Sequence, residues 1–306
     1  MLSIFLAHTL SWNDEALTVA MEVFFRGTGD DGKNFIQQVL RITGENLDRL
    51  SLFGSWIDYV ERAPYNTKCF NHWRSTKKGI PLGSKNYTTE DLDSTLSSFE
   101  KSLFPQTITG AWTTTTAYKS YFGLFLEAFD PTNVANYHSD VFVNGDNNGR
   151  DFIVEYNGSK TNLHDFWGSL CGQLNNHYPF SAEAWAEIDQ FTYEISKAHG
   201  NAPRIEAIND IFNQSLDTAI RTVYQNVEYG KPLTENYIEK CRAVAPKLLA
   251  SAAYSLAKKQ KSISLPQISP VRYDQPMSQL LAMGYCVMFI LLPPAIFLGV
   301  KSFCHH

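Results

Sequence analysis

The chain has 306 residues, of which 44% are hydrophobic and 19% charged, and its formal net charge at pH 7 is −5. This length allows one large domain or two small ones, and the composition is that of an ordinary globular protein. A net negative charge provides no general attraction for nucleic acid, so it argues against binding of long duplexes through a basic surface. An enzyme that holds one or two nucleotides through metal ions would not need such a surface.

Two apolar segments lie at the ends of the chain. Residues 1–11 (MLSIFLAHTLS) end in small residues and predict a short secretory signal peptide, with a frayed N-terminal strand or a truncated gene as the alternatives. Residues 280–300 form an uncharged stretch of 21 residues, long enough to cross a bilayer as a helix. The adjacent Pro293 and Pro294 argue against a buried helix of a soluble domain, but membrane helices tolerate proline.

These segments predict a type I membrane protein at the cell surface or in a membrane of the secretory pathway. The ectodomain would occupy residues 12–262, followed by a proline-containing stalk at 263–279. The transmembrane helix at 280–300 would then lead into a cytoplasmic tail at 301–306, and Lys301 suits that cytoplasmic end.

Five cysteines are few for a secreted chain. Cys286 lies in the predicted span and Cys304 in the tail, so Cys69, Cys171 and Cys241 remain for the ectodomain. At most one disulfide can form among these three, and the sequence leaves the pairing open. Asn-X-Ser/Thr triplets that fit a secretory route begin at three positions, namely Asn86, Asn157 and Asn213.

The remaining sequence is mainly helical in its periodicity. Residues 12–25 predict a first helix, capped by Asn13 or Asp14, with apolar side chains at helical spacing. Similar patterns predict further helices, taken in chain order, at residues 33–42, 45–60, 87–103, 113–129, 182–198, 204–228 and 234–261.

One stretch differs from this helical pattern. In residues 151–167 (DFIVEYNGSKTNLHDFW) apolar side chains alternate, and then Asn157-Gly158 gives a strong turn signal, so a β-hairpin is expected near residues 152–161. The chain then places His164 at the start of a predicted helix. An imidazole at a rigid strand-to-helix junction is well held for a metal ion, and a solvated surface histidine is the plainer alternative.

The run from 145 to 169 resembles a segment of the class I zinc-dependent single-strand nucleases, the S-one/P-one nuclease family. In that family a GGN turn precedes a strand, a short turn and the motif NLHxxWD. Here residues 148–150 read Asn-Gly-Arg, residues 162–164 read Asn-Leu-His, Trp167 is retained and Gly168 replaces the final Asp. The resemblance implies an all-α fold shared with phospholipase C, three clustered zinc ions, and cleavage of single-stranded nucleic acid and 3′-nucleotides.

Four further motifs extend the resemblance from Trp12 to about residue 262. Trp12 stands where signal cleavage would expose it, and the family's N-terminal Trp binds zinc through its amine and carbonyl. Asp58 follows Trp56-Ile57, as in the family's zinc-binding WAD, and His72 and Asp130 match two other ligand motifs. The implied zinc ligands are Trp12, Asp58, His72, Asp130 and His164, with Asp58 and Asp130 as candidate catalytic carboxylates. Taken alone, Asp58 reads as a solvated helix residue and His72 as a loop histidine.

Other ligand positions of the family are substituted in this chain. They hold Leu17, Leu126, Asn136 and Gly168. A leucine cannot coordinate a metal ion and a glycine has no side chain, so zero or one zinc ion is expected, held by Asp58, His72 and Asp130. His138 is the candidate for a compensating ligand, and Asp140 and Asp165 are also close in sequence to lost ligands.

Two classes of function follow from the resemblance. The first is a membrane-anchored phosphodiester hydrolase of the nuclease and 3′-nucleotidase family, with impaired or lost catalysis, whose partners would be single-stranded nucleic acid or nucleotides. The second is a noncatalytic surface protein that uses the nuclease fold to bind a nucleotide, a lipid headgroup or a protein. A zinc phospholipase of similar architecture is a minor third alternative.

Overall fold

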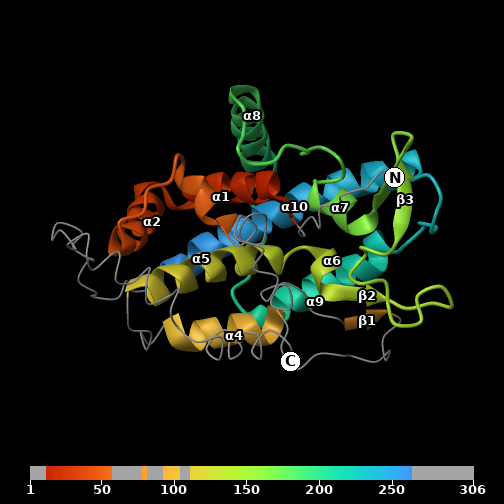
Figure 1. The fold of residues 1–306 in the computed structure, drawn as a ribbon, viewed down its shortest axis with the longest axis horizontal. Helices are drawn as coiled ribbons and strands as arrows, with labels where there is room; N and C mark the ends of the chain where they lie inside the picture. Colours follow the sequence, from red (N-terminus) through yellow and green to blue (C-terminus); the bar gives the residue numbers. More distant parts are fainter. Residues whose placement is uncertain (1–11, 57–77, 81–91, 104–110, 264–306) are drawn as a thin grey trace, which may run out of the picture.

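The computed structural model describes residues 12–56, 78–80, 92–103 and 111–263, and most of these residues are helical (Figure 1). The expectation of a mainly helical domain is therefore confirmed. The predicted signal peptide at 1–11 and the predicted span at 280–300 lie outside the described residues. Among the helices that are described, none combines the length and the apolar character needed to cross a bilayer.

The first two helices are separated by glycine. Asn13 caps α1 (Asp14–Thr28), because its side-chain oxygen accepts a hydrogen bond from the Ala16 N–H at 2.8 Å. Gly29 stands between α1 and α2 (Asp30–Thr43) with a φ of 61°, and Gly44 ends α2 in the left-handed conformation.

The helix expected at residues 45–60 does not begin there. The Glu45 N–H closes the end of α2 by donating to the Leu40 carbonyl, and the Glu45 side chain contacts Thr43 and Lys119. Residue 45 therefore completes one helix and does not start the next. A single 3₁₀ turn, η1 (Leu50–Phe53), follows, and the expected helix is wrong over residues 45–49.

An aromatic cluster fills the core between these elements and α5 (Ala111–Glu127). Phe122 of α5 lies 5.7 Å from Phe24 of α1, 5.8 Å from Phe35 of α2 and 5.4 Å from Phe53 of η1, measured between ring centroids. Rings at these separations add attraction beyond the burial of their apolar area. This packing fixes α5, whose C-terminal end leads into the candidate site.

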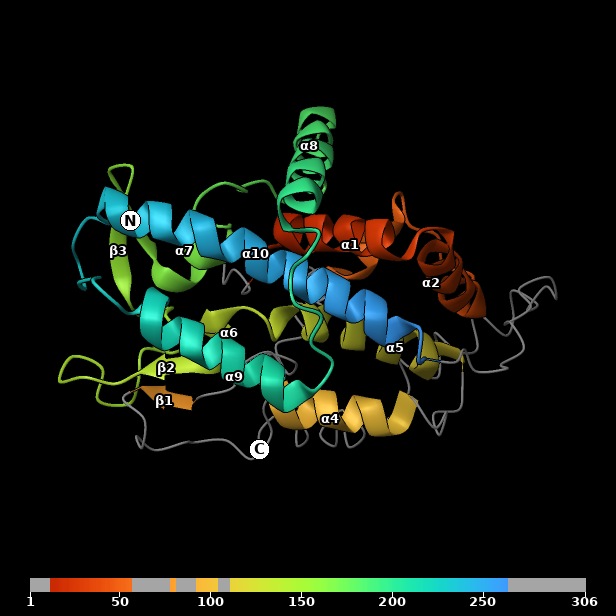
Figure 2. The ribbon, with the colours of Figure 1, turned by 180° about the vertical axis from the view of Figure 1, so that it is seen from behind.

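The longest helix is α10 (Glu235–Gln260), which runs along most of the molecule and packs on α1, α5 and α8 (Ala182–His199) (Figure 2). Helix α8 projects from the body in both views (Figures 1 and 2). Its buried face consists of Ala184, Ile188, Thr192 and Ile195. Helix α4 (Leu92–Leu103) lies against the other side of α5.

The single helix expected at residues 204–228 is a shorter one. Helix α9 (Ile208–Thr218) continues into a π-helical turn, η3 (Ala219–Val223), and the chain then leaves the helix. Residues before Ile208 stay extended because the Ile205 N–H donates to the Ser255 hydroxyl of α10 at 2.7 Å. This tertiary hydrogen bond thus engages the Ile205 N–H, a donor that would lie inside a helix beginning at residue 204.

Two small sheets complete the fold. The expected hairpin is present, with β3 (Ile153–Tyr156) paired antiparallel to β4 (Ser159–Asn162), and it leads directly into α7 (Leu163–Gly168). The second sheet was not expected from the sequence. It pairs β1 (Lys78–Ile80) in parallel with β2 (Ala135–Tyr137), which follows the short helix α6 (Pro131–Val134).

A disulfide joins Cys171 to Cys241, and both residues are fully buried. The bond connects the turn after α7 to α10, so it holds the hairpin end of the molecule to its longest helix. This pairing selects one of the alternatives that the cysteine count leaves open, and Cys69 lies outside the described residues.

Candidate functional site

Of the five implied ligands, Trp12, Asp130 and His164 lie within the described residues, and each is completely buried. Asp58 and His72 lie outside the described residues. The geometry of the candidate site is therefore built around Asp130 and His164.

Asp130 stands at the junction between α5 and α6. Its N–H donates to the Glu127 carbonyl at the end of α5, and its side chain caps α6. The Oδ1 atom of Asp130 accepts hydrogen bonds from both the N–H and the hydroxyl of Thr132, each at 2.7 Å. Pro131 fits this position, because the first residue of a helix needs no N–H donor.

His164 lies in the first turn of α7 and faces the same segment. Its Nδ1 atom is 3.0 Å from the Asn148 carbonyl oxygen and 3.2 Å from the Thr132 hydroxyl oxygen. Thr132 therefore connects the two implied ligands, since its hydroxyl contacts Asp130 and His164 at once. The structure brings Asp130 and His164 together although 34 residues separate them in the sequence (164 − 130).

Asn148 holds this arrangement from a third segment. Its side-chain amide donates to the carbonyls of Thr132 at 3.1 Å, Asn133 at 3.3 Å and Ala135 at 2.8 Å. These carbonyls belong to α6 and to the start of β2, so one buried side chain ties the turn before the hairpin to the segment after Asp130. Sequence reasoning noted Asn148 only as part of a turn.

The substituted positions Leu126 and Gly168 lie next to the start of α1. The Trp12 indole Nε1–H donates to the Leu126 carbonyl at 3.1 Å, and the Asn13 N–H donates to the Gly168 carbonyl at 3.0 Å. Leu17 and Leu126 are fully buried members of the apolar core. The two leucines thus contribute packing at positions where the resemblance implies histidine ligands.

An amide network surrounds the fourth substituted position, Asn136. Its Oδ1 atom accepts from the Asn148 N–H at 3.4 Å, and its Nδ2 atom is 3.4 Å from Nε2 of His138. The His138 ring also lies 3.4 Å from the Val143 carbonyl through Nδ1. Gly145 permits this packing, because a Cβ there would lie 1.9 Å from Asn136 Nδ2.

The described residues do not supply a complete set of zinc ligands. Among them no group of three His, Cys, Asp or Glu side chains is arranged to hold a metal ion. The resemblance implies two partner ligands for His164, and these two positions hold Asn136 and Gly168 in this chain. The resemblance assigns Asp130 to a zinc position together with Asp58 and His72, which lie outside the described residues.

Asp146, which sequence reasoning missed, is a fully buried carboxyl close to this network. Burial raises the pKa of Asp146 to about 6, although its hydrogen bond from the Tyr137 N–H at 2.9 Å and the Tyr224 hydroxyl act in the opposite direction. In turn, burial raises the pKa of Tyr224 well above its ordinary value, with the Asp146 charge as a second cause.

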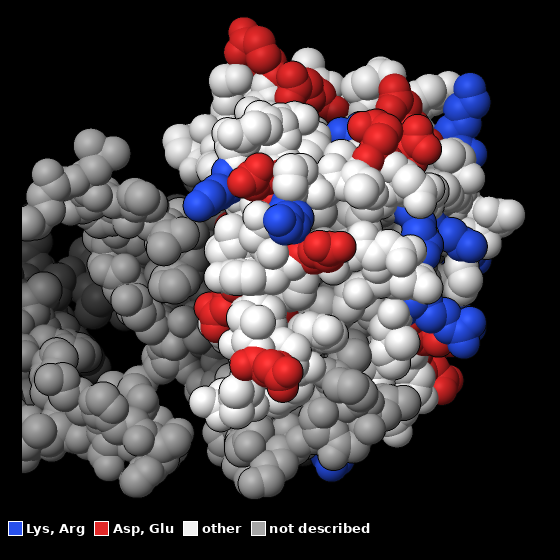
Figure 3. All heavy atoms as spheres, turned by 90° about the vertical axis from the view of Figure 1, so that its right-hand side faces the viewer, with Lys and Arg blue, Asp and Glu red and all other residues white. Residues whose placement is uncertain are grey.

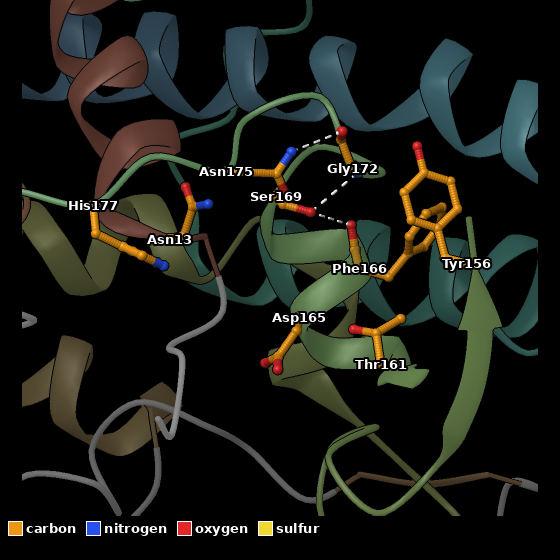
Figure 4. Close-up of a pocket in the computed structure, with 9 residues that line it drawn as sticks. All are labelled: Asn13, Tyr156, Thr161, Asp165, Phe166, Ser169, Gly172, Asn175 and His177. Carbon is orange, nitrogen blue, oxygen red and sulfur yellow. Dashed lines mark hydrogen bonds between the residues drawn. The ribbon is translucent and has the colours of Figure 1, made fainter. Parts of the chain in front are cut away.

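A pocket of about 170 Å³ opens beside α7, and Asp130 and His164 do not line it (Figure 4). Figure 4 shows its lining around the α7 ribbon, with His177 and Tyr156 on opposite sides. The lining residues are Asn13, Tyr156, Thr161, Asp165, Phe166, Ser169, Gly172, Asn175 and His177. One wall is held by Asp14, which contacts the His177 ring at 2.9 Å and accepts from the Tyr178 N–H at 2.7 Å.

The surface around the hairpin end carries both signs of charge. On the face drawn in Figure 3, lysine and arginine side chains are interspersed with aspartate and glutamate.

Comparison with protein families adds an independent observation. The model described as S1/P1 Nuclease matches residues 134–264. The matched segment contains β2, the Asn148 turn, the hairpin, His164 and both cysteines of the disulfide, whereas Trp12, Asp58, His72 and Asp130 precede it. No curated protein matches the chain.

Proposed function

The chain belongs to the S1/P1 nuclease family through residues 134–264, and on this premise we propose that it is a membrane-anchored relative whose phosphodiester hydrolysis is impaired or lost. The proposed substrates are single-stranded nucleic acid and 3′-nucleotides. One observation carries the proposal of impairment. Asp130 and His164 are held together by Thr132, but Leu126, Asn136 and Gly168 stand where this family has further ligands.

The family is zinc-dependent, and one zinc position remains available by donor chemistry. Asp130 would share it with Asp58 and His72, and zinc there would act as a Lewis acid that activates water. Asp130 would contribute a carboxylate oxygen whose direction is set by Thr132. His164 would be a ligand of a neighbouring zinc position. That position would lack its carboxylate ligand, because Gly168 replaces the aspartate of the family motif.

A noncatalytic surface protein is the second candidate, and the amide network favours it. Asn136 and Asn148 hydrogen-bond to each other and to their neighbours where an active member would place a charged metal centre. Polar groups that satisfy one another in this way stabilise a fold without any ion. The fold would then serve to present a binding surface.

We place this protein at the cell surface or in a secretory membrane, with the ectodomain at residues 12–262 outside. The Cys171–Cys241 disulfide supports an oxidising compartment. The triplet at Asn157 begins in the exposed hairpin turn and the one at Asn213 on the exposed side of α9, where glycans are sterically accessible; Asn86 lies outside the described residues. Residues 1–11 would be the signal peptide and residues 280–300 the anchor.

The first prediction concerns metal content and catalysis. The purified chain is expected to contain at most one tightly bound zinc ion. It should cleave single-stranded DNA or 3′-nucleotides far more slowly than an intact family member, because loss of even an outer partner of a ligand costs about 10–100-fold and direct ligands are missing here. Elemental analysis of the folded protein, beside a zinc-supplemented nuclease assay, measures both quantities.

Three zinc ions per chain together with robust cleavage would contradict this proposal. His138→Ala would then show whether the imidazole beside Asn136 had replaced a lost ligand, since this change should remove one ion and most of the activity. His199→Ala, at the C-terminal end of α8, is the matched control and should change neither, because it makes the same substitution at a histidine outside the site.

The second prediction is that the mature chain begins at Trp12. The position of Trp12 is fixed by its own bond to the Leu126 carbonyl and by the bond from the Asn13 N–H to the Gly168 carbonyl, so cleavage there would leave the new amine one residue before the Asn13–Gly168 bond. N-terminal sequencing of the protein recovered from a secretory host should read Trp-Asn-Asp. Recovery of a chain that still carries Met1 would remove the amine ligand from the proposal.

A further inference from the structure

We infer that Asn148 is the positioning residue for His164, and that it holds the imidazole as the tautomer protonated on Nδ1. The Nε2 atom then carries the lone pair and is the basic nitrogen of the site. The relevance of this arrangement to hydrolysis depends on the proposed function, whereas the tautomer and its cause depend only on the contacts of His164.

The two partners of Nδ1 determine where the proton sits. The Asn148 carbonyl oxygen, at 3.0 Å, can only accept a hydrogen bond, so Nδ1 must be the donor. The Thr132 hydroxyl, at 3.2 Å, directs its own hydrogen to Asp130 Oδ1 at 2.7 Å and therefore offers a lone pair to the same Nδ1–H. Both contacts select the same tautomer of His164.

The Asn148 carbonyl is held firmly because the side chain of the same residue is anchored. Its amide donates to three carbonyls, those of Thr132, Asn133 and Ala135, and its N–H donates to the Asn136 side chain. The backbone of Asn148 adopts a left-handed conformation with a φ of 60°, which asparagine tolerates better than most residues. The anchored turn therefore points a carbonyl at His164.

The next residue brings this carbonyl close to α7. Gly149 has a φ of 81°, and a Cβ on it would lie 3.1 Å from the His164 backbone nitrogen. The absence of a side chain at Gly149 therefore lets the backbone of this turn lie close to the backbone at the start of α7. An imidazole that donates Nδ1–H to a backbone carbonyl has its ring orientation and its tautomer fixed by that bond.

The tautomer can be read directly from the full chain labelled with ¹⁵N-histidine. Two-bond nitrogen–proton couplings at pH 7.5 distinguish Nδ1–H from Nε2–H, and the His164→Gln variant identifies the His164 signal by its loss. We expect the neutral form of the ring to carry its proton on Nδ1. A ring protonated on Nε2 would overturn the inference. Because the measurement needs neither zinc nor activity, its failure is distinct from failure of the proposed hydrolysis.

The positioning role is tested with Asn148→Ala, with Asn147→Ala as the matched control. Both residues have left-handed backbones, with φ of 60° and 54°, so both substitutions carry the same backbone cost. The Asn147 side chain is exposed, whereas that of Asn148 makes the three bonds to carbonyls. We expect the ratio of Nδ1–H to Nε2–H in His164 to fall roughly tenfold in Asn148→Ala only.

An unchanged His164 signal in Asn148→Ala would overturn the positioning role, as would an equal change in Asn147→Ala. If Asn148→Ala does not fold, Asn148→Gly replaces it, because glycine adopts the left-handed backbone at no steric cost and also lacks the amide. Asn147→Gly is then the matched control, because Asn147 has the same left-handed backbone. The wild-type tautomer is measured in every case, so the first half of the inference is decided independently of either variant.

Discussion

Removal of the Cys171–Cys241 disulfide is expected to lower the free energy of unfolding by about 4 kcal/mol. The bond closes a loop with a sequence separation of 70 residues, and a cross-link over such a length restricts the unfolded chain strongly. The double variant Cys171→Ala with Cys241→Ala shows the effect in urea denaturation. Its midpoint should fall, and the pocket wall at Gly172 should become accessible to proteolysis first.

The reducing agent provides the control for this prediction. Reduction of the wild-type chain should reproduce the loss seen in the double variant, whereas reduction of the double variant should change nothing further. If reduction destabilises the double variant as well, another cysteine contributes a bond. If the wild type and the double variant have equal stability without reducing agent, the Cys171–Cys241 bond does not restrict the unfolded state.

The elements that the sequence predicted well are those whose signals are local. The hairpin followed from alternation and the Asn157-Gly158 turn, and Asn157 and Gly158 indeed have φ of 49° and 73°. Helices α1, α8 and α10 followed from capping residues and apolar spacing within one segment. Their ends agree with the expectation to within a few residues.

The elements that the sequence did not predict depend on distant partners. The strands β1 and β2 have three residues each and exist because they pair with one another across the chain. The local pattern allows Glu45 to start a helix. In the structure, however, its N–H donates to the Leu40 carbonyl and its carboxylate forms an ion pair with Lys119. Short strands and helix ends set by tertiary bonds leave no periodic signal to read.

The candidate site shows the same division. A motif pointed to Asp130 and to His164, but Thr132, which joins them, carries no signal of its own, and Asn148 stood out only as part of a turn motif. Asn148 acts through carbonyls 13 to 16 residues away, and a sequence does not reveal which carbonyls an amide will reach. The asparagine-rich turn before Gly149 was the one available hint, because consecutive asparagines favour left-handed backbone.

The second large effect concerns the buried carboxyl of Asp146. Its pKa in the folded state is about 6, above the ordinary value of 3.8, because burial disfavours the charged form. The folded state therefore holds the proton more tightly than the unfolded state does. The stability that this proton provides is complete below about pH 4, declines as the pH rises and is lost above about pH 6.

Asp146→Asn is accordingly expected to raise the free energy of unfolding at pH 7.5 by about 3 kcal/mol, the equivalent of the shift of the Asp146 pKa. The asparagine oxygen can still accept from the Tyr137 N–H, and its amide can donate to the Tyr224 hydroxyl, so the packing is retained. Below pH 4 the variant and the wild type should have the same stability. Chemical denaturation at pH 4 and pH 7.5 gives the comparison.

Asp140→Asn is the matched control, because it removes an exposed carboxylate from the same loop without altering a buried group. It should follow the wild type at both pH values. If Asp146→Asn has no greater stability than the wild type at pH 7.5, ionisation of Asp146 is compensated inside the fold. Hydrogen bonds from the Tyr137 N–H and the Tyr224 hydroxyl would then have to stabilise the charged Asp146 carboxylate as well as water does. In that case protonation of Asp146 at acidic pH would not raise the free energy of unfolding.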